Sequence, residues 1–289
     1  MCYLCSFFSS RPDNNAAQYE PIGQTRRNFL LASSFALGAS ADALAQVDVG
    51  RASTLRRLVP AEELERAADQ QYSQLIEQAR QQGVLVPGQD PQVQRLRRMA
   101  QRLIPHTVPW NERAQTWRWE VNLIASKEIN AFCMPGGKIA FYTGILENLQ
   151  LTDDEVAMIM GHEMAHALRE HAREQVAKTQ ATGLGLSTLS SLLGLGQLGD
   201  VAANLGTQLL SLRFSRDDET EADLVGLELA ARSSYRPQAS VTLWQKMSAQ
   251  DRQSSLSFLS THPSGKDRIQ KLQANLPKVQ KLYEMALKK

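Results

Sequence analysis

The spacing of apolar and polar positions predicts two helices in the first part of the chain. Residues 61–82 and 92–104 both place apolar side chains three to four positions apart among charged ones, which is the period of a helix. The glycines and prolines of residues 83–91 predict a loop between these helices, and Pro105 stops the second one. We expect both helices to pack on the part of the chain that follows.

The pattern then changes to the period of a β-strand. Residues 117–126 alternate apolar and polar side chains, which predicts a strand. Pro135, Gly136 and Gly137 mark a tight turn between two short apolar strands, and Gly144 opens a further helix. The hairpin could hold an extended peptide along an exposed strand edge, or it could be purely structural. The pattern leaves both readings open.

A strong helix start signal follows the hairpin. Thr152 is a good N-cap, and Glu155 completes a capping box three residues later. The apolar Val156 and Ile159 give the beginning of the helix a buried face. We expect one continuous helix as far as residue 178.

This predicted helix carries the sequence GHEMAHALREH at residues 161–171. His162 and His166 are four positions apart, so they share one helix face and could place two imidazole nitrogens on a tetrahedral zinc ion. Glu163 could take a proton from a water at the metal as that water attacks a carbonyl. This is the HExxH pattern, although a charged helix can show it by chance. His171 falls on the opposite side of a continuous helix, so we interpret it as a solvated surface residue.

An acidic segment further along offers a third ligand. Glu219 and Asp223 are four apart on a predicted helix, and a catalytic zinc site needs three protein ligands and one open position. Glu219 would be that ligand, and Asp223 would hydrogen-bond a ligand imidazole and fix its orientation. Glu221 points elsewhere by helical phase. Taken alone, the segment would be read as an acidic solvated helix.

Composition and charge narrow the class of protein. The 289 residues are 43% hydrophobic and 21% charged, which is ordinary for a globular chain of one or two domains. The net charge is only +2, so nothing in it favours binding to nucleic acid. Of the three cysteines, Cys2 and Cys5 precede the predicted domain, and Cys133 is expected to be a buried apolar residue. A thiolate-rich structural zinc site is therefore disfavoured.

An export signal is predicted before the domain. Residues 25–31 read TRRNFLL, a short apolar run follows, and ALA stands at residues 43–45. This order is typical of a twin-arginine signal that is cleaved after Ala45. We therefore expect residues 1–45 to be the signal and residues 46–289 to be exported to a bacterial periplasm. An uncleaved N-terminal anchor is the alternative.

Residues 182–212 form a second unusual segment, which is rich in glycine, leucine and serine. Asp200 and the many glycines argue against a membrane span. We expect buried helices that flank the active site. The alternative is an apolar surface patch that meets a membrane or an unfolded client protein.

Several motifs together resemble peptidase family M48. They are GHEMAH, then SRDDETEAD, then THPSGKDRI, with NAFCMPGGKIAFYTGIL ahead of the first. The similarity runs from about Trp117 to Arg268 and keeps the order and spacing of the family, which includes HtpX-type membrane proteases and soluble periplasmic members. It implies a zincin-like zinc endopeptidase with one zinc ion per chain.

The resemblance assigns roles to the candidate residues. The metal ligands would be His162, His166 and Glu219, and Glu163 would be the general base. Asp223 matches an aspartate that lies behind the ligands in the family.

The third motif adds His262 and Arg268, which the resemblance places at the metal site and beside its acidic groups. The imidazole of His262 could donate a hydrogen bond to the oxyanion of the reaction, or it could occupy the open metal position and hold the enzyme inactive. A loop histidine that caps the next helix is the plain alternative. The sequence leaves these roles open.

These observations predict a mostly helical α+β metallopeptidase domain at residues 46–289. Residues 46–110 would form a helical segment, and residues 111–289 a catalytic core with a small antiparallel sheet. The expected function is periplasmic hydrolysis of peptide bonds in misfolded or envelope proteins, and the alternative is a latent protease-fold chaperone or binding protein of the cell envelope. Expected partners are protein or peptide substrates and no nucleic acid, with peripheral contact to a membrane or to outer-membrane assembly machinery as a further option.

Overall fold

The computed structural model describes most of the chain after the predicted signal. The described residues are 47–181, 209, 212–251, 257–263, 265 and 267–288. They belong to one contact unit, Ala45–Lys289. The predicted signal at residues 1–45 lies outside the described residues, and so does nearly all of the segment 182–212. Within the described part, no helix combines the length and the apolar character that crossing a membrane requires.

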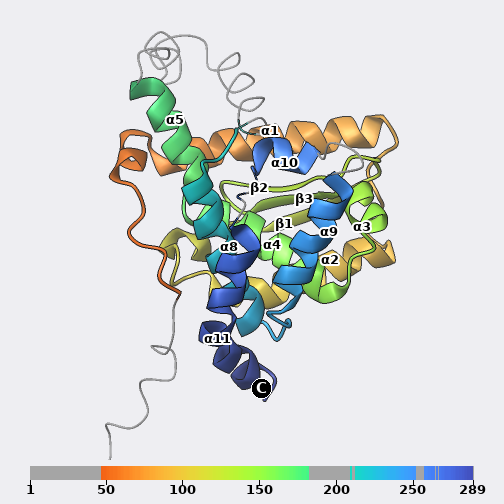
Figure 1. The fold of residues 1–289 in the computed structure, drawn as a ribbon. Coiled ribbons are helices and arrows are strands. Elements are labelled where there is room, and N and C mark those ends of the chain that lie inside the picture. The colour runs from red at the N-terminus through yellow and green to blue at the C-terminus, as the bar shows by residue number, and fades with distance from the viewer. Residues whose placement is uncertain are drawn as a thin grey trace, which may run out of the picture. The chain divides into compact units, whose positions relative to one another are not determined.

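Helices dominate the described part of the chain (Figure 1). The elements in chain order are η1 (Thr54–Leu58), α1 (Ala61–Gln81), α2 (Pro91–Leu103), η2 (Ile104–His106), η3 (Glu112–Gln115), β1 (Glu120–Ile124), β2 (Ala131–Met134), β3 (Lys138–Tyr142), α3 (Thr143–Asn148), α4 (Asp153–Leu168), α5 (His171–Ala181), α8 (Arg216–Arg232), α9 (Ala239–Asp251), α10 (Ser257–Thr261) and α11 (Arg268–Ala286). The two predicted N-terminal helices are confirmed as α1 and α2. Asp90 caps α2 through its side chain, and Pro91 occupies the first turn, where its missing N–H costs nothing.

The sheet has three strands in the order β1-β3-β2, and it differs in one respect from the predicted antiparallel arrangement. The hairpin of β2 and β3 is antiparallel as expected, whereas β1 pairs with β3 in parallel. The chain reverses direction after β1 and again at the turn of residues 135–137, so β1 and β3 run the same way with β3 between the other two. The sheet is therefore mixed, and β2 is an edge strand.

Helices cover both faces of this sheet. Side chains alternate along β3, so Ile139 and Phe141 face the core that contains α4, while Ala140 faces the cluster that contains Tyr72 of α1. In Figure 1, α1 runs along one side of the strands and α4 passes on the other. The α4 helix thus lies on this face of the sheet, directly against β2.

The start of α4 is as predicted, but its end is not. Thr152 and Glu155 form the expected capping box. The predicted continuous helix to residue 178 is wrong, because α4 ends at Leu168 and α5 begins at His171 in a new direction. Glu170 between them has a positive φ of 59°, a conformation that breaks a helix. Asn111 donates to the carbonyl of Leu168 at 3.1 Å and so satisfies one group that the break exposes.

Two glycines allow α4 and α8 to cross with their backbones in contact. A Cβ atom on Gly226 would lie 2.6 Å from the backbone nitrogen of His162, and one on Gly161 would lie 2.8 Å from the carbonyl oxygen of Gly226. Neither position has room for a side chain, because the obstructing atoms belong to backbone. The crossing therefore sets how close the side chains of α8 come to those of α4.

Replacement of Gly226 with alanine tests this packing. Glycine to alanine inside a helix normally stabilises a protein by about 1 kcal/mol. Here we expect Gly226→Ala to lower the free energy of unfolding by at least about 1 kcal/mol, because overpacking a close contact typically costs about 1–3 kcal/mol. Urea unfolding of the metal-free protein measures the difference. A variant as stable as the wild type, or more stable, would contradict the close crossing.

Candidate metal centre

The α4 helix presents its two histidines and the intervening glutamate toward one buried point. His162, Glu163 and His166 are all buried. The Nε2 atoms of the two imidazoles lie 3.1 Å apart, as expected for residues one turn apart on the same helix face. Glu163 follows His162 directly, and its Oε1 atom is buried without a hydrogen-bond partner. Such an atom is costly to bury unless the site supplies a partner.

The α8 helix adds two carboxylates to this point. Glu219 places Oε1 3.4 Å from Nε2 of His166 and Oε2 3.5 Å from Nε2 of His162. Asp223 lies one turn later on the helix, and its Oδ1 atom is 3.0 Å from Nδ1 of His162. Ser215 caps α8 in a capping box with Asp218, which fixes the start of the helix next to the cluster.

Two further residues, His262 and Arg268, come from the chain after α9 and complete the surroundings of the cluster. His262 follows α10 and lies with Nδ1 3.0 Å from Oε1 of Glu219 and Nε2 3.6 Å from Oε1 of Glu163. Arg268, the first residue of α11, contacts Glu219 at 2.9 Å and Asp223 at 2.7 Å and lies over the ring of Trp244. Both side chains are buried. His262 therefore belongs to the cluster itself. Arg268 lies next to the cluster and offsets the negative charge of Glu219 and Asp223.

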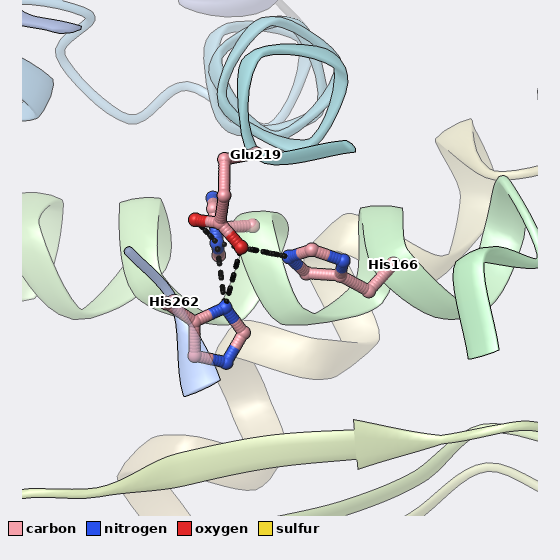
Figure 2. Close-up of side chains that lie close together, drawn as sticks. His166, Glu219 and His262 are labelled. Carbon is pink, nitrogen blue, oxygen red and sulfur yellow. Dashed lines mark hydrogen bonds and ion pairs between the residues drawn. The ribbon is translucent and has the colours of Figure 1, made fainter. Parts of the chain in front are cut away.

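Four of these residues have the composition and spacing of a metal site. One ligand atom from each of His162, His166, Glu219 and His262 lies within 4.8 Å of the others. Figure 2 shows the carboxylate of Glu219 directed at the imidazoles of His166 and His262. Imidazole nitrogens turned toward one another in a buried space, with a carboxylate beside them, lack enough protons for mutual hydrogen bonding. A divalent cation satisfies all of them at once, so the residues fit a metal ion.

Burial and the neighbouring charges shift the ionisation of the cluster. Burial raises the pKa of Glu163 and lowers that of His166 well below its usual range, which keeps His166 in the neutral form that metals bind. Burial also opposes the charged form of His162, but its hydrogen bonds with Asp223 and Glu219 outweigh this effect and raise its pKa to about 9. The carboxylates of Asp223 and Glu219 thus stabilise a positive charge at His162. A bound cation would supply this charge in place of the extra proton on the imidazole.

A cleft of about 250 Å³ opens beside the cluster. Phe132 and Cys133 of β2 line one side, and Phe214 lies among the lining residues with Glu163 and His166. The cleft thus connects the cluster with the edge strand β2. Cys133 is buried with its thiol beside the carbonyl of Met134, as expected for an apolar cysteine, and burial raises its pKa well above the ordinary value.

His171 is the residue that the sequence interpretation misplaced. It was expected on the solvated surface, but its side chain is buried, and its Nδ1 atom lies 2.9 Å from Nδ1 of His166. The break at Glu170 redirects the chain and brings His171 back to the cluster. Glu221 does point away from the four clustered residues, yet it contacts His171 and Arg169. No glycine, proline or asparagine marks the break, so the sequence offered no signal for it.

Comparison with known proteins identifies the family. Residues 91–276, well over half of the chain, match the model of Peptidase family M48. The mitochondrial metalloendopeptidase OMA1 of Schizosaccharomyces pombe is 40% identical over 166 residues, which cover 56% of this chain and 48% of that protein. The metalloprotease LoiP of Escherichia coli is 31% identical over 151 residues, or 50% of this chain and 58% of LoiP.

A third relative is the beta-barrel assembly-enhancing protease of Escherichia coli, which is 30% identical over 159 residues, or 51% of this chain and 32% of that protein. The chain spans about half the length, or less, of most of these relatives. The mostly helical α+β fold with its buried metal site is zincin-like, as the sequence predicted. The chain belongs to peptidase family M48, and its HExxH-type metal site is intact.

Proposed function

We propose that this chain is a zinc-dependent endopeptidase that hydrolyses peptide bonds in protein substrates. One observation carries the proposal: His162, His166 and Glu219 converge in a buried cluster, and beside it lies a carboxylate oxygen of Glu163 that has no hydrogen-bond partner. Nitrogen and carboxylate ligands without sulfur suit zinc in a hydrolytic site. The activity of the relatives in the same family supports this assignment.

The residues around the ion have separate tasks in this proposal. Bound zinc would polarise the scissile carbonyl and lower the pKa of a water molecule to about 7. Glu163 accepts a proton from the attacking water and passes it to the amine that leaves when the C–N bond breaks. Asp223 accepts the Nδ1 proton of His162 and so directs Nε2 toward the ion. Arg268 holds Glu219 and Asp223 in place.

The substrate would enter as an extended strand along β2. The edge position of β2 leaves its outer backbone groups available, and the cleft beside it leads to Glu163 and His166. Pairing with a strand edge reads the substrate backbone rather than its side chains, which suits a protease with many substrates. The apolar Phe132 in the cleft would contact side chains of the bound peptide.

We place this activity in the bacterial periplasm, after export through the signal of residues 1–45 and release of residues 46–289. The substrate class that we propose is misfolded or envelope proteins, and the similarity to the beta-barrel assembly-enhancing protease of Escherichia coli supports it. The relatives named OMA1 are mitochondrial, so the placement in the periplasm rests on the predicted signal of residues 1–45. Peripheral contact with that membrane or with its assembly machinery is part of the proposal.

Replacement of Glu163 with glutamine tests the catalytic role of this residue. Glutamine keeps the size of the side chain and cannot accept the proton, so we expect casein cleavage to fall by at least about 100-fold. Zinc content should stay at that of the wild type, because Glu163 is not a ligand. Glu147→Gln, on the exposed surface of α3, is the matched control and should cleave normally. Full activity in Glu163→Gln would refute the mechanism.

The position of His262 favours a second state of the same protein. With His262 in the cluster, four protein atoms surround the metal position, whereas catalysis requires an open place for water and substrate. We infer that this arrangement is a closed, latent form and that His262 must move before the enzyme acts. A latent protease-fold chaperone or binding protein is the alternative function that such closure supports.

Replacement of His262 with alanine distinguishes these roles. Loss of a blocking ligand should raise casein cleavage several-fold and weaken zinc binding, which chelator competition measures. If cleavage is instead lost while zinc affinity is unchanged, His262 acts on the oxyanion and does not block the metal. If zinc is bound and neither His262→Ala nor the wild type cleaves casein or unfolded protein, the binding-protein alternative is favoured.

A further inference from the structure

The imidazole of His166 is held on three sides. Its Nε2 atom faces the metal cluster, 3.1 Å from Nε2 of His162. The ring of Phe214 stacks on its face with a centroid distance of 3.9 Å. Its remaining nitrogen, Nδ1, lies 2.9 Å from Nδ1 of His171, whose side chain is only 2% exposed. The proposed metal chemistry uses the first of these contacts and leaves the contact with His171 unexplained.

Proton counting fixes how the two histidines pair. A hydrogen bond between two Nδ1 atoms needs one proton, so one ring donates and the other accepts. A ring that binds a metal through Nε2 must carry its proton on Nδ1. His166 is therefore the donor and His171 the acceptor. The proton of a neutral His171 then lies on Nε2, which points at Oε2 of Glu221 at 3.4 Å, near the outer limit of a hydrogen bond.

Glu221 is itself fixed at the far end of this pair. Its Oε2 atom accepts from Nε of Arg169 at 2.7 Å, and Arg169 also donates to the carbonyl of Gly50 at 3.1 Å. Arg169 is buried at the C-terminal end of α4. The carboxylate thus has a fixed direction and an arginine behind it, so it can orient His171 instead of rotating freely.

The other ligand histidine has a support of the same kind. Nδ1 of His162 contacts Asp223 at 3.0 Å, and Arg268 contacts the same carboxylate at 2.7 Å. On this side, a carboxylate backed by an arginine meets the ligand directly. On the side of His166, the carboxylate and the arginine act through one interposed imidazole. In both supports a carboxylate of α8 is backed by an arginine from another segment, Arg268 behind Asp223 and Arg169 behind Glu221.

We propose that His171 is a positioning residue for zinc binding, which accepts the Nδ1 proton of His166 and is oriented in turn by Glu221. This inference rests on the zinc site proposed above and deepens it. His171 contacts neither the ion nor the substrate, so it acts only through the direction and proton position of His166. The helix break at Glu170 is what makes the contact, because a continuous helix would carry His171 away from His166.

Zinc affinity measured at equilibrium tests the proposal without reference to activity. His171→Phe keeps a planar buried ring and removes the acceptor, and we expect its zinc dissociation constant to rise by about 10–100-fold, as for other partners behind ligand histidines. His171→Asn can place its side-chain oxygen near the position of Nδ1, so it should recover most of the affinity. A purely structural role for the ring would favour phenylalanine over asparagine, which is the opposite order.

A chelator competition series provides the measurement and its controls. Wild type, His171→Phe, His171→Asn and His106→Phe are compared, and thermal unfolding of each metal-free protein shows whether it folds. His106 lies in η2, outside the cluster, so its replacement should leave zinc affinity unchanged. Equal affinity of His171→Phe and wild type would overturn the inference while leaving the zinc site standing. A wild type that binds no zinc would overturn the proposed function and the inference together.

Nitrogen-15 spectra of the zinc-loaded wild type show which imidazole nitrogens carry protons. They therefore test the inference even if His171→Phe fails to fold. The inference predicts a proton on Nδ1 of His166 and, for His171, a proton on Nε2 with an unprotonated Nδ1. A proton on Nδ1 of His171 directed at an unprotonated His166 nitrogen would overturn it.

Discussion

The close crossing of α4 and α8 is the contact on which the candidate metal centre depends. Gly161 and Gly226 bring the two backbones together, so that Glu219 and Asp223 reach the imidazole of His162 across the interface. A Cβ atom at either glycine would press on the backbone of the other helix and force the two helices apart. The sheet supports α4 from the other side, and both capping boxes fix where the helices begin.

This packing buries several charged and polar groups next to one another. Glu163, Glu219 and Asp223 are all buried beside histidines of the cluster, which is unfavourable unless positive charge accompanies them. Arg268 supplies part of it, and the imidazoles can supply the rest only by holding protons. A divalent cation relieves the same imbalance while leaving the imidazoles neutral. The cation that would balance the buried carboxylates is therefore the same ion that a metal-dependent hydrolase uses.

The sequence predicted the parts that follow from local pattern. The HExxH spacing put His162 and His166 on one helix face, and the same spacing of four put Glu219 and Asp223 on one face of another, because this rule depends only on residues near in sequence. That the two pairs meet at one metal ion was implied by the resemblance to the family and by the need for a third ligand. The parallel pairing of β1 and the burial of His171 were not predictable in this way. The first depends on which strand inserts between two others, and the second on a single residue, Glu170, that adopts positive φ without a glycine.

X-ray absorption at the zinc edge tests most directly whether these residues form a zinc site. We expect about one zinc ion per chain, with nitrogen and oxygen neighbours at about 2.0–2.1 Å and the outer-shell scattering of histidine rings. Loss of the ion in His166→Ala would assign that scattering to this cluster. Absence of stoichiometric zinc, or a sulfur neighbour at about 2.3 Å that would place the ion at Cys133, would contradict the account.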